Sequence, residues 1–225
     1  MGYSSRVTRT SVTTDVGVLD KAAAILAAVE QRPLELAALV EATGFHRATA
    51  HRLATALEMH GLLRRDGAGR FVLGSWLVSL GRAAAAGLPL RDVARPILEA
   101  LVEATGESAQ LYVVQGNNRL CVESVESPNG LRTIVAVGQL LPLDRGSAGK
   151  ALLSAKGLKN GWAESVGERE AGVASVSAPI ADLDGRVVAA VSVSGPIERT
   201  SRLPGRKYGG AVVSAARAIA GAAGW

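Results

Sequence analysis

Hydrophobic residues recur every three or four positions in three segments near the start of the chain, a spacing typical of one face of an α-helix. The first predicted helix begins near Val18 and ends at Pro33, with the apolar face Leu19, Ala22, Ala23, Leu26 and Val29. A second runs from Leu36 to Gly44, a residue suited to a left-handed C-cap. A third begins near His46, with the apolar stripe Ala50, Leu53, Ala54 and Leu57. We expect the stripes to pack as a three-helix core.

The third predicted helix also carries a polar cluster around its first two turns, largely off the apolar stripe. The cluster is Arg47, Thr49, His51 and Arg52. Two helices in this arrangement are typical of a helix-turn-helix. In that motif the second helix packs by one side and offers its N-terminal part to the major groove of DNA.

A short hairpin is predicted immediately after this motif. Residues 62–65 and 70–73 have the composition of strands, and the four residues between them include two glycines that permit positive φ. A helix-turn-helix followed by a hairpin predicts a winged helix. Arg64, Arg65 and Arg70 would place positive charge on the wing, where phosphates or a minor groove can meet it. The alternative is that these arginines form only a solvated surface.

Beyond the wing, the pattern changes twice. A helix over 75–89, with Trp76 and Leu80, is predicted to link two domains and to help a second subunit dock; the alternative is packing within its own domain. From Leu90 onward a helix, several strands and further helices follow. The expected segments are a helix ending at Gly106, strands 109–115, 119–126 and 133–137, a helix over 147–154, strands 173–181 and 187–194, and a helix over 208–222. This order predicts an α+β sheet domain.

Composition narrows the class of protein. The chain has 225 residues, of which 48% are hydrophobic, and a net charge of +5, which suits a nucleic-acid partner. The basic character is regional, because all three histidines and five of the arginines lie between residues 46 and 70. Cys121 is the only cysteine, which excludes an internal disulfide and fits a reducing cytosol. No apolar run approaches the roughly 18 residues of a membrane span, so we expect a cytoplasmic protein without membrane contact.

Several chemical interpretations can be set aside or left open. Residues 146–150 resemble a phosphate-binding loop, but the first required glycine would fall at Asp144 and Ala151 stands where a hydroxyl is needed. A serine hydrolase is disfavoured because no G-x-S-x-G is present and no histidine follows residue 60. The histidines lack the spacing of metal ligands, so neither a metal nor a cofactor is expected. Cys121 is interpreted as a buried, inert thiol, and Trp162 as either a pocket wall or core.

Several stretches resemble the IclR family of bacterial transcriptional regulators, and the resemblance covers nearly the whole chain. They are GVLDKAAAIL, HRATAHRLATALEMHGLLRRDGAGRFVLG, GSAGKALL, GVASVSAPI and GRVVAAVSVSGP. Within the family, GESAQLY and GEREAGVASVSAPI are most similar to the actinobacterial NdgR-like branch, whose members are associated with amino-acid metabolism. The resemblance implies a winged-helix DNA-binding domain joined by a helix to a GAF-like effector domain, in dimers or dimers of dimers.

The resemblance also implies a role for each polar residue of the third helix. Carried over to this chain, Arg47, Ala48, Thr49 and His51 face the bases, and Arg52 faces the phosphates. The chemistry suits these roles, since arginine can bind guanine O6 and N7 bidentately and threonine can offer its methyl group to thymine.

The implied effector pocket is formed in this chain by Ser147, Ala148, Ser165, Ser175, Ser192 and Ser194. Ser147 and Ala148 would present backbone amides at a helix N-terminus to an anionic group of the ligand. Ser192 and Ser194 would offer hydroxyls from a late strand. Ser165 and Ser175 stand where some carboxylate-binding members carry an aspartate and a cysteine, so the effectors of those members do not carry over.

One departure from the family pattern concerns the junction at residues 155–161. Only residues 156–160 separate GSAGKALLSA from GWAESVGERE, where the family usually has a helical segment of some tens of residues. Either the protein has lost this segment or the sequence as given omits a loop. Omission is favoured, because a deletion would remove one wall of the expected pocket.

The sequence therefore predicts a disordered arm over 1–15, a winged helix-turn-helix domain over 16–74, a linker helix over 75–89 and an effector-binding domain over 90–225. The predicted function is a ligand-responsive transcriptional regulator, without enzyme activity, of amino-acid or related small-metabolite pathways. It would bind palindromic double-stranded DNA operators as a homodimer and respond to an amino acid or small carboxylate. The alternative is a small-molecule binding module whose winged helix mediates protein contacts.

Overall fold

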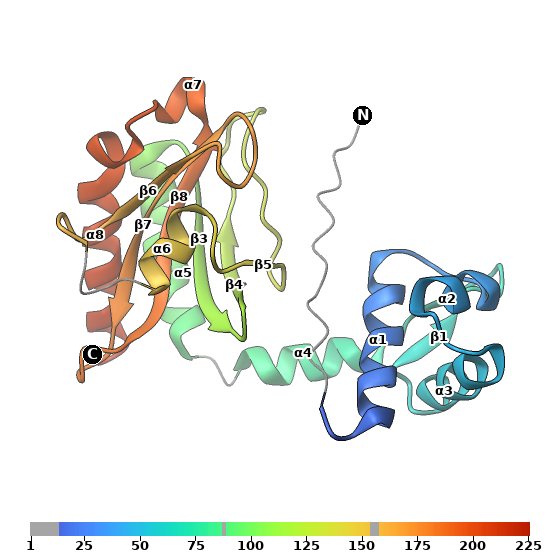
Figure 1. The fold of residues 1–225 in the computed structure, drawn as a ribbon. Helices are drawn as coiled ribbons and strands as arrows, with labels where there is room; N and C mark the ends of the chain where they lie inside the picture. Colours follow the sequence, from blue (N-terminus) through green and yellow to red (C-terminus); the bar gives the residue numbers. More distant parts are fainter. Residues whose placement is uncertain (1–13, 87–88, 154–157) are drawn as a thin grey trace. The chain divides into compact units, whose positions relative to one another are not determined.

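The structure is a computed structural model that describes residues 14–86, 89–153 and 158–225 (Figure 1). These residues divide into two compact units, which meet in the sequence at residues 87 and 88. Most of the predicted arm, and residues 154–157 of the shortened junction, lie outside the described residues. None of the described helices is long and apolar enough to cross a membrane.

The first unit is a winged helix, as predicted. Its elements are α1 (Gly17–Gln31), α2 (Leu36–Thr43), α3 (Arg47–Met59), β1 (Leu63–Arg65), β2 (Phe71–Leu73) and α4 (Trp76–Ala86). β1 and β2 pair in antiparallel fashion, with Leu63 opposite Leu73. The segment after α1 adds a bridge to this hairpin, because Leu34 and Phe71 exchange two backbone hydrogen bonds of 3.0 and 2.8 Å.

The helix ends follow the signals in the sequence. Arg32 has an extended backbone because it precedes Pro33, and α1 therefore stops at Gln31. Gly44 caps α2 with φ of 70°, and its N–H donates to the Val40 carbonyl at 2.8 Å. The α2 to α3 turn is thereby set by one glycine.

The predicted face of α1 is partly wrong. Ile25 and Val29 are its buried residues, with Ala22 and Leu26 packed against the same cluster, whereas Leu19 is 63% exposed. Ala23 is exposed as well. The reason is geometric: the first turn of α1 lies outside the hydrophobic cluster, so the buried face is centred on Ile25 rather than on Leu19.

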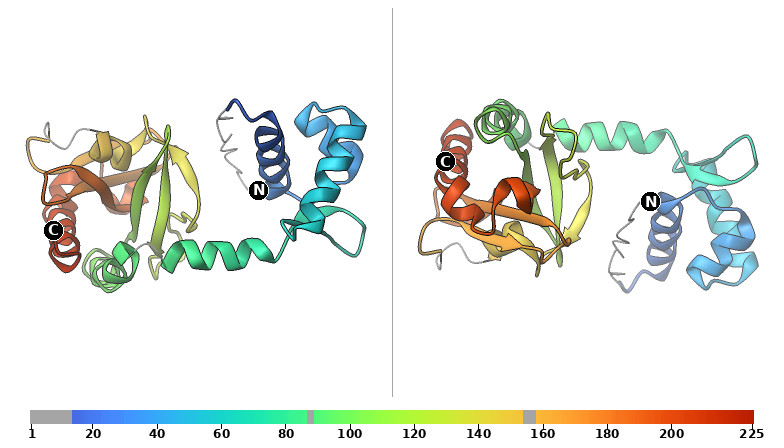
Figure 2. Two further views of the ribbon diagram at one scale, coloured as in Figure 1. Left: turned by 90° about the horizontal axis from the view of Figure 1, so that it is seen from below. Right: turned by 90° about the horizontal axis from the view of Figure 1, so that it is seen from above.

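The second unit is a six-stranded antiparallel sheet in the order β5-β4-β3-β8-β7-β6. Its elements are α5 (Pro89–Thr105), β3 (Ser108–Gln115), β4 (Asn118–Val125), β5 (Leu140–Pro142), α6 (Gly146–Leu153), β6 (Ala163–Val166), β7 (Val173–Ala181), β8 (Val187–Pro196), α7 (Ile197–Thr200) and α8 (Pro204–Ala222). α5 and α8 cover one face of the sheet and α6 lies on the other (Figure 2). The predicted α+β class is confirmed.

The two faces of the sheet have different chemistry. Side chains alternate along a strand, so Leu111 and Val191 join the apolar core beneath α5 and α8. Gln110 and Ser192 occupy the other face and are also buried. The α6 side of the sheet is therefore a buried polar surface, which is the setting of the candidate site.

The prediction of a strand over 133–137 is wrong. Thr133 and Val135 are buried and Ile134 is exposed, so the alternating pattern is present. The backbone nevertheless forms no ladder there; the Thr133 carbonyl instead accepts a hydrogen bond from Ser108 Oγ at 2.7 Å. The strand of this region is β5, which pairs with β4.

Three further elements differ from the expectation. β6 and α7 are not predicted by the sequence pattern, because both are only four residues long. α8 begins at Pro204 rather than at Tyr208, since a proline is tolerated in the first turn of a helix.

A buried ion pair stabilises the end of β8. The carboxylate of Glu107, which is 1% exposed, accepts hydrogen bonds of 2.7 and 2.8 Å from Arg199. We expect Arg199→Ala to lower the free energy of unfolding of this unit by about 2 to 4 kcal/mol, because it leaves the carboxylate buried and unpaired. Urea denaturation followed by circular dichroism measures this loss. Arg186→Ala is the control, since its contact with Asp184 at 3.7 Å is solvent-exposed; equal effects of the two substitutions would contradict the prediction.

Candidate functional site

The N-terminal half of α3 presents polar side chains to solvent. Arg47, Ala48, His51 and Arg52 are exposed and Thr49 is half-buried. Ala50, Ala54 and Leu57, on the other side of the helix, are buried. Within the described residues, neither Arg47 nor Arg52 has an ion-pair or hydrogen-bond partner. The structure thus places all five predicted α3 residues on one open stretch of helix.

The three arginines of the wing divide into two kinds. Arg70 pairs with Asp66 at 2.7 Å, and Arg65 stacks 4.1 Å above the ring of Phe71 and lies 3.4 Å from Glu58. Hydrogen bonds from the Arg70 side chain and backbone lower the pKa of Asp66, which keeps its carboxylate charged. Arg64 is exposed and, in the part of the chain that the structure describes, has no such partner. Arg65 and Arg70 therefore also hold the hairpin together.

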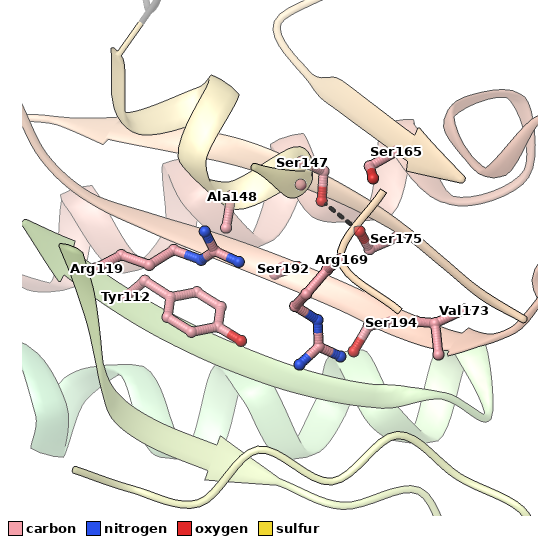
Figure 3. A pocket seen from close by; sticks show the side chains of 11 residues that line it. Tyr112, Arg119, Ser147, Ala148, Ser165, Arg169, Val173, Ser175, Ser192 and Ser194 are labelled. Carbon is pink, nitrogen blue, oxygen red and sulfur yellow. Dashed lines mark hydrogen bonds between the residues drawn. The ribbon is translucent and has the colours of Figure 1, made fainter. Parts of the chain in front are cut away.

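The second unit encloses a small polar cavity between α6 and the sheet (Figure 3). Its described lining residues are Tyr112, Arg119, Gly146, Ser147, Ala148, Ser165, Arg169, Val173, Ser175, Ser192 and Ser194. The cavity measures about 20 Å³, counted as space open to the centre of a water molecule. All six residues that the sequence nominated for an effector pocket lie around it. They come from α6, β6, β7 and β8, so the fold assembles them from distant parts of the sequence.

The serine hydroxyls form a chain along the floor of the cavity. Ser147 Oγ lies 2.7 Å from the hydroxyls of both Ser175 and Ser177, and Ser177 donates to Ser192 at 2.8 Å. Ser194 donates to the Gln110 side chain at 3.1 Å. Each hydroxyl has one hydrogen and two lone pairs, so such a chain keeps spare capacity for a ligand.

The start of α6 is held by close contacts on two sides. Gly149 leaves no room for a side chain, because a Cβ there would lie 2.1 Å from the Leu143 carbonyl oxygen. Glu168 accepts a hydrogen bond from Gly146 N–H at 3.2 Å and forms an ion pair with Lys150. Burial raises the pKa of Glu168, but the hydrogen bonds from Lys150 and Gly146 more than offset this, and the net pKa is lowered. The first amides of α6, which lack partners within a helix, are thus positioned beside the cavity.

Two arginines and a tyrosine in the lining are absent from the sequence-based prediction. Arg119 is 3% exposed and donates to the carbonyl oxygens of Pro142 and Arg145. Burial lowers the pKa of its guanidinium. Burial raises the pKa of Tyr112, so its hydroxyl stays protonated and can donate. The sequence signal for them is weak: Arg119 lies second in a strand of mixed polarity, and Arg169 stands between two glutamates.

Two side chains left open by the sequence are resolved by the structure. Cys121 is fully buried, and burial raises the pKa of its thiol to about 12, as expected for an inert cysteine. Trp162 packs against α8, where a Cβ at Gly205 or Gly209 would overlap its ring. Since Trp162 is absent from the described cavity lining, it fills the core.

The chemistry of the cavity is suited to binding an anion. The described lining offers guanidiniums, hydroxyls and the amides of a helix N-terminus, all of which donate hydrogen bonds to negative groups. Among these lining residues there is no histidine that could accept a proton from a serine.

The two units match the models of one known family. Residues 18–67 match the IclR helix-turn-helix domain, and residues 82–160 and 155–221 match the C-terminal domain of the bacterial transcriptional regulator IclR. The two C-terminal segments overlap at residues 155–160.

Individual proteins are similar over most of their length. The chain is 28% identical over 196 residues to the HTH-type transcriptional regulator KipR of Bacillus subtilis, covering 72% of this chain and 78% of KipR. It is 29% identical over 216 residues to the glycerol operon regulatory protein of Streptomyces griseus, covering 80% and 85%. A solved IclR homologue from Microbacterium hydrocarbonoxydans, complexed with 4-hydroxybenzoate, matches with a TM-score of 0.78 at 22% identity, covering 91% of this chain and 98% of that one.

The chain combines a winged helix, whose recognition helix is exposed, with a sheet domain that encloses a polar cavity. This combination defines a DNA-binding regulator with a ligand-binding domain. The family models cover more than half of the sequence and include both units. The chain belongs to the IclR family of bacterial transcriptional regulators, and the predicted family and general function are confirmed.

Proposed function

We propose that this protein binds palindromic operators as a homodimer or dimer of dimers, and that a small anionic effector in the cavity changes its operator affinity. The observation that carries the proposal is the gathering of all six nominated residues and two arginines around one cavity. Effector control requires that the ligand bind the DNA-competent and DNA-incompetent arrangements with different affinity.

In the proposed complex, the exposed start of α3 lies in the major groove. Arg47, Ala48, Thr49 and His51 contact base edges, and Arg52 contacts phosphates. The wing arginines Arg64, Arg65 and Arg70 add phosphate or minor-groove contacts. Their exposure in the free protein supports this role, with Arg64 the most available because it has no partner among the described residues.

The proposed effector is an amino acid or small carboxylate. One carboxylate would accept hydrogen bonds from the amides of Ser147 and Ala148, and the hydroxyls of Ser165, Ser175, Ser192 and Ser194 would surround it. The homologue complexed with 4-hydroxybenzoate holds a ligand with one carboxylate, which supports this chemical class. We place the protein in amino-acid or related metabolism, in the NdgR-like branch, acting in the cytoplasm.

We propose residues 16–74 as the DNA-binding domain, 75–89 as a linker helix and 90–225 as the effector domain. In α4, Trp76, Val78 and Leu80 are between 42% and 73% exposed, which suits contact with a second subunit. A twofold axis would then place two recognition helices on half-sites about one DNA turn apart.

A thermal-shift screen tests the effector proposal. Amino acids and small carboxylates are added to the purified protein, and a true ligand at about 100 times its dissociation constant adds about 2.7 kcal/mol to the free energy of unfolding. The same compound at saturation is expected to change operator affinity in a gel-shift titration. A compound that stabilises the protein but leaves operator binding unchanged would contradict the regulatory part of the proposal.

The alternative is a small-molecule binding module whose winged helix docks on a protein. Arg47, Arg52 and Arg64 have no partner among the described residues, and this favours DNA, because phosphate contacts need free positive charge. Affinity for duplex that falls steeply with salt separates the two functions, since a protein-docking surface would lack this dependence.

A further inference from the structure

Two guanidinium groups line one small cavity, and they come from opposite sides of it (Figure 3). Arg119 belongs to β4, whereas Arg169 belongs to the segment between β6 and β7. Their like charges disfavour one another, because the charge on Arg169 lowers the pKa of Arg119. Two cations beside one cavity are unfavourable unless a negative charge lies near them.

Arg119 is incompletely satisfied in this structure. One terminal nitrogen donates to the carbonyl oxygens of Pro142 and Arg145, but Nε is buried and has no partner among the described residues. Asp144 favours the charged form of Arg119 without pairing with it. A buried guanidinium with an unpartnered N–H is costly, so a negative group beside the rest of the Arg119 guanidinium would be favourable.

Arg169 stands at the rim of the same cavity. Its side chain is 21% exposed, and its closest acidic neighbour is Glu170, at 3.6 Å, whose side chain is 60% exposed. Figure 3 shows the hydroxyl of Tyr112 pointing toward Arg169, with Ser194 beside it. Because water screens the contact with Glu170, most of the hydrogen-bonding capacity of Arg169 remains available to a ligand.

The charge balance of the cavity therefore favours two negative charges. Among the described residues that line it, two are arginines and none is acidic. Glu168, which lies nearby, is engaged by Lys150 and by Gly146 N–H. A ligand with a single carboxylate would neutralise one guanidinium and leave the other without a counter-charge.

We propose that the effector is a compact dianion, with two negative groups that face Arg119 and Arg169 from opposite ends. This inference rests on the proposed function, because it assigns the charge of the ligand in the same cavity. One anionic group lies at the start of α6, within reach of Arg119. The other meets Arg169 and the hydroxyl of Tyr112. A four-carbon dicarboxylate carries two such groups and serves as the probe of this inference.

The test compares succinate, butyrate and inorganic phosphate by isothermal titration calorimetry with the full chain. Succinate and butyrate have equal carbon counts and differ in one carboxylate; phosphate places its negative charge on one centre. We expect wild-type protein to bind succinate at least about tenfold more tightly than butyrate, since each charged hydrogen bond to an anion contributes about that factor. Phosphate that binds more tightly than succinate would place both negative charges on one centre and would contradict two groups at opposite ends.

Variants assign the preference to Arg169. Arg169→Gln is expected to weaken dianion binding about tenfold or more and to leave butyrate binding within about twofold. Arg186→Gln, an exposed arginine on the same unit, is the control and leaves both unchanged. Equal affinity for butyrate and the dianions, or equal weakening of both by Arg169→Gln, overturns the dianion inference while the proposed effector site stands. If no amino acid or carboxylate binds at all, the proposed function itself fails.

Discussion

Gly149→Ala is expected to destabilise the second unit and to disturb its cavity. The added Cβ would lie 2.1 Å from the carbonyl oxygen of Leu143 and 3.0 Å from its carbonyl carbon. These are backbone atoms, so the overlap cannot be relieved by rotating a side chain. Either α6 or the loop before it has to move, and overpacking of this kind costs about 3 kcal/mol.

The same substitution is expected to impair effector binding, because α6 carries Ser147 and Ala148 into the cavity. Urea denaturation measures the stability of the variant, and calorimetry with a ligand from the screen measures its affinity. Gly210→Ala is the matched control: it lies in α8 with no atom within 4 Å of an added Cβ, so alanine there is expected to add up to about 1 kcal/mol. A Gly149→Ala variant as stable as wild type would show that α6 is not packed as described.

The second large effect concerns the two arginines of α3. Arg47→Ala is expected to weaken operator binding by about 1 to 3 kcal/mol and to leave binding to random duplex nearly unchanged, because a base-reading contact is lost. Arg52→Ala is expected to weaken binding to both duplexes and to reduce the salt dependence by about one charge, because a phosphate contact is lost. Both side chains are exposed, so neither variant should unfold the domain.

The measurement uses an operator selected from a random duplex library by the wild-type protein. Fluorescence anisotropy at several salt concentrations then gives the affinity and the salt slope for each variant. Arg217→Ala, on α8 of the other unit, controls for net charge alone. If Arg47→Ala weakened both duplexes equally, Arg47 would be a phosphate contact and the assignment of roles along α3 would be wrong.

Where a single residue marks the end of an element, the sequence predicts the structure closely. Pro33 ends α1 and Gly44 ends α2, because proline restricts the residue before it and glycine alone adopts the left-handed region without strain. The β3 to β4 turn follows Gly116 and Asn117 for the same reason. Each of these residues acts through its own backbone preference, so the end of the element does not depend on distant contacts.

Features that depend on distant contacts could not be predicted in this way. Residues 133–135 alternate in burial although they form no strand, and periodicity alone cannot separate such a segment from a paired strand. No sequence pattern shows that Arg119 and Arg169, 50 residues apart, face one cavity, so neither is among the predicted site residues. The nominated serines came from the family resemblance, not from periodicity.

The hydroxyls of Ser147, Ser177 and Ser192 form a row of hydrogen bonds whose hydrogens can point in either direction along the row. When Ser192 donates to Ser177 and Ser177 to Ser147, Ser147 keeps the hydrogen bond that it donates to Ser175. In the opposite direction Ser177 donates to Ser192, and the single hydrogen of Ser147 turns from Ser175 to Ser177. By such rotations the row can offer a hydrogen-bond donor to a ligand group that accepts, or a lone pair to a ligand group that donates. No oxygen atom has to move. The row of hydroxyls can therefore present either a donor or an acceptor to the cavity, whereas the guanidinium groups of Arg119 and Arg169 keep a fixed charge.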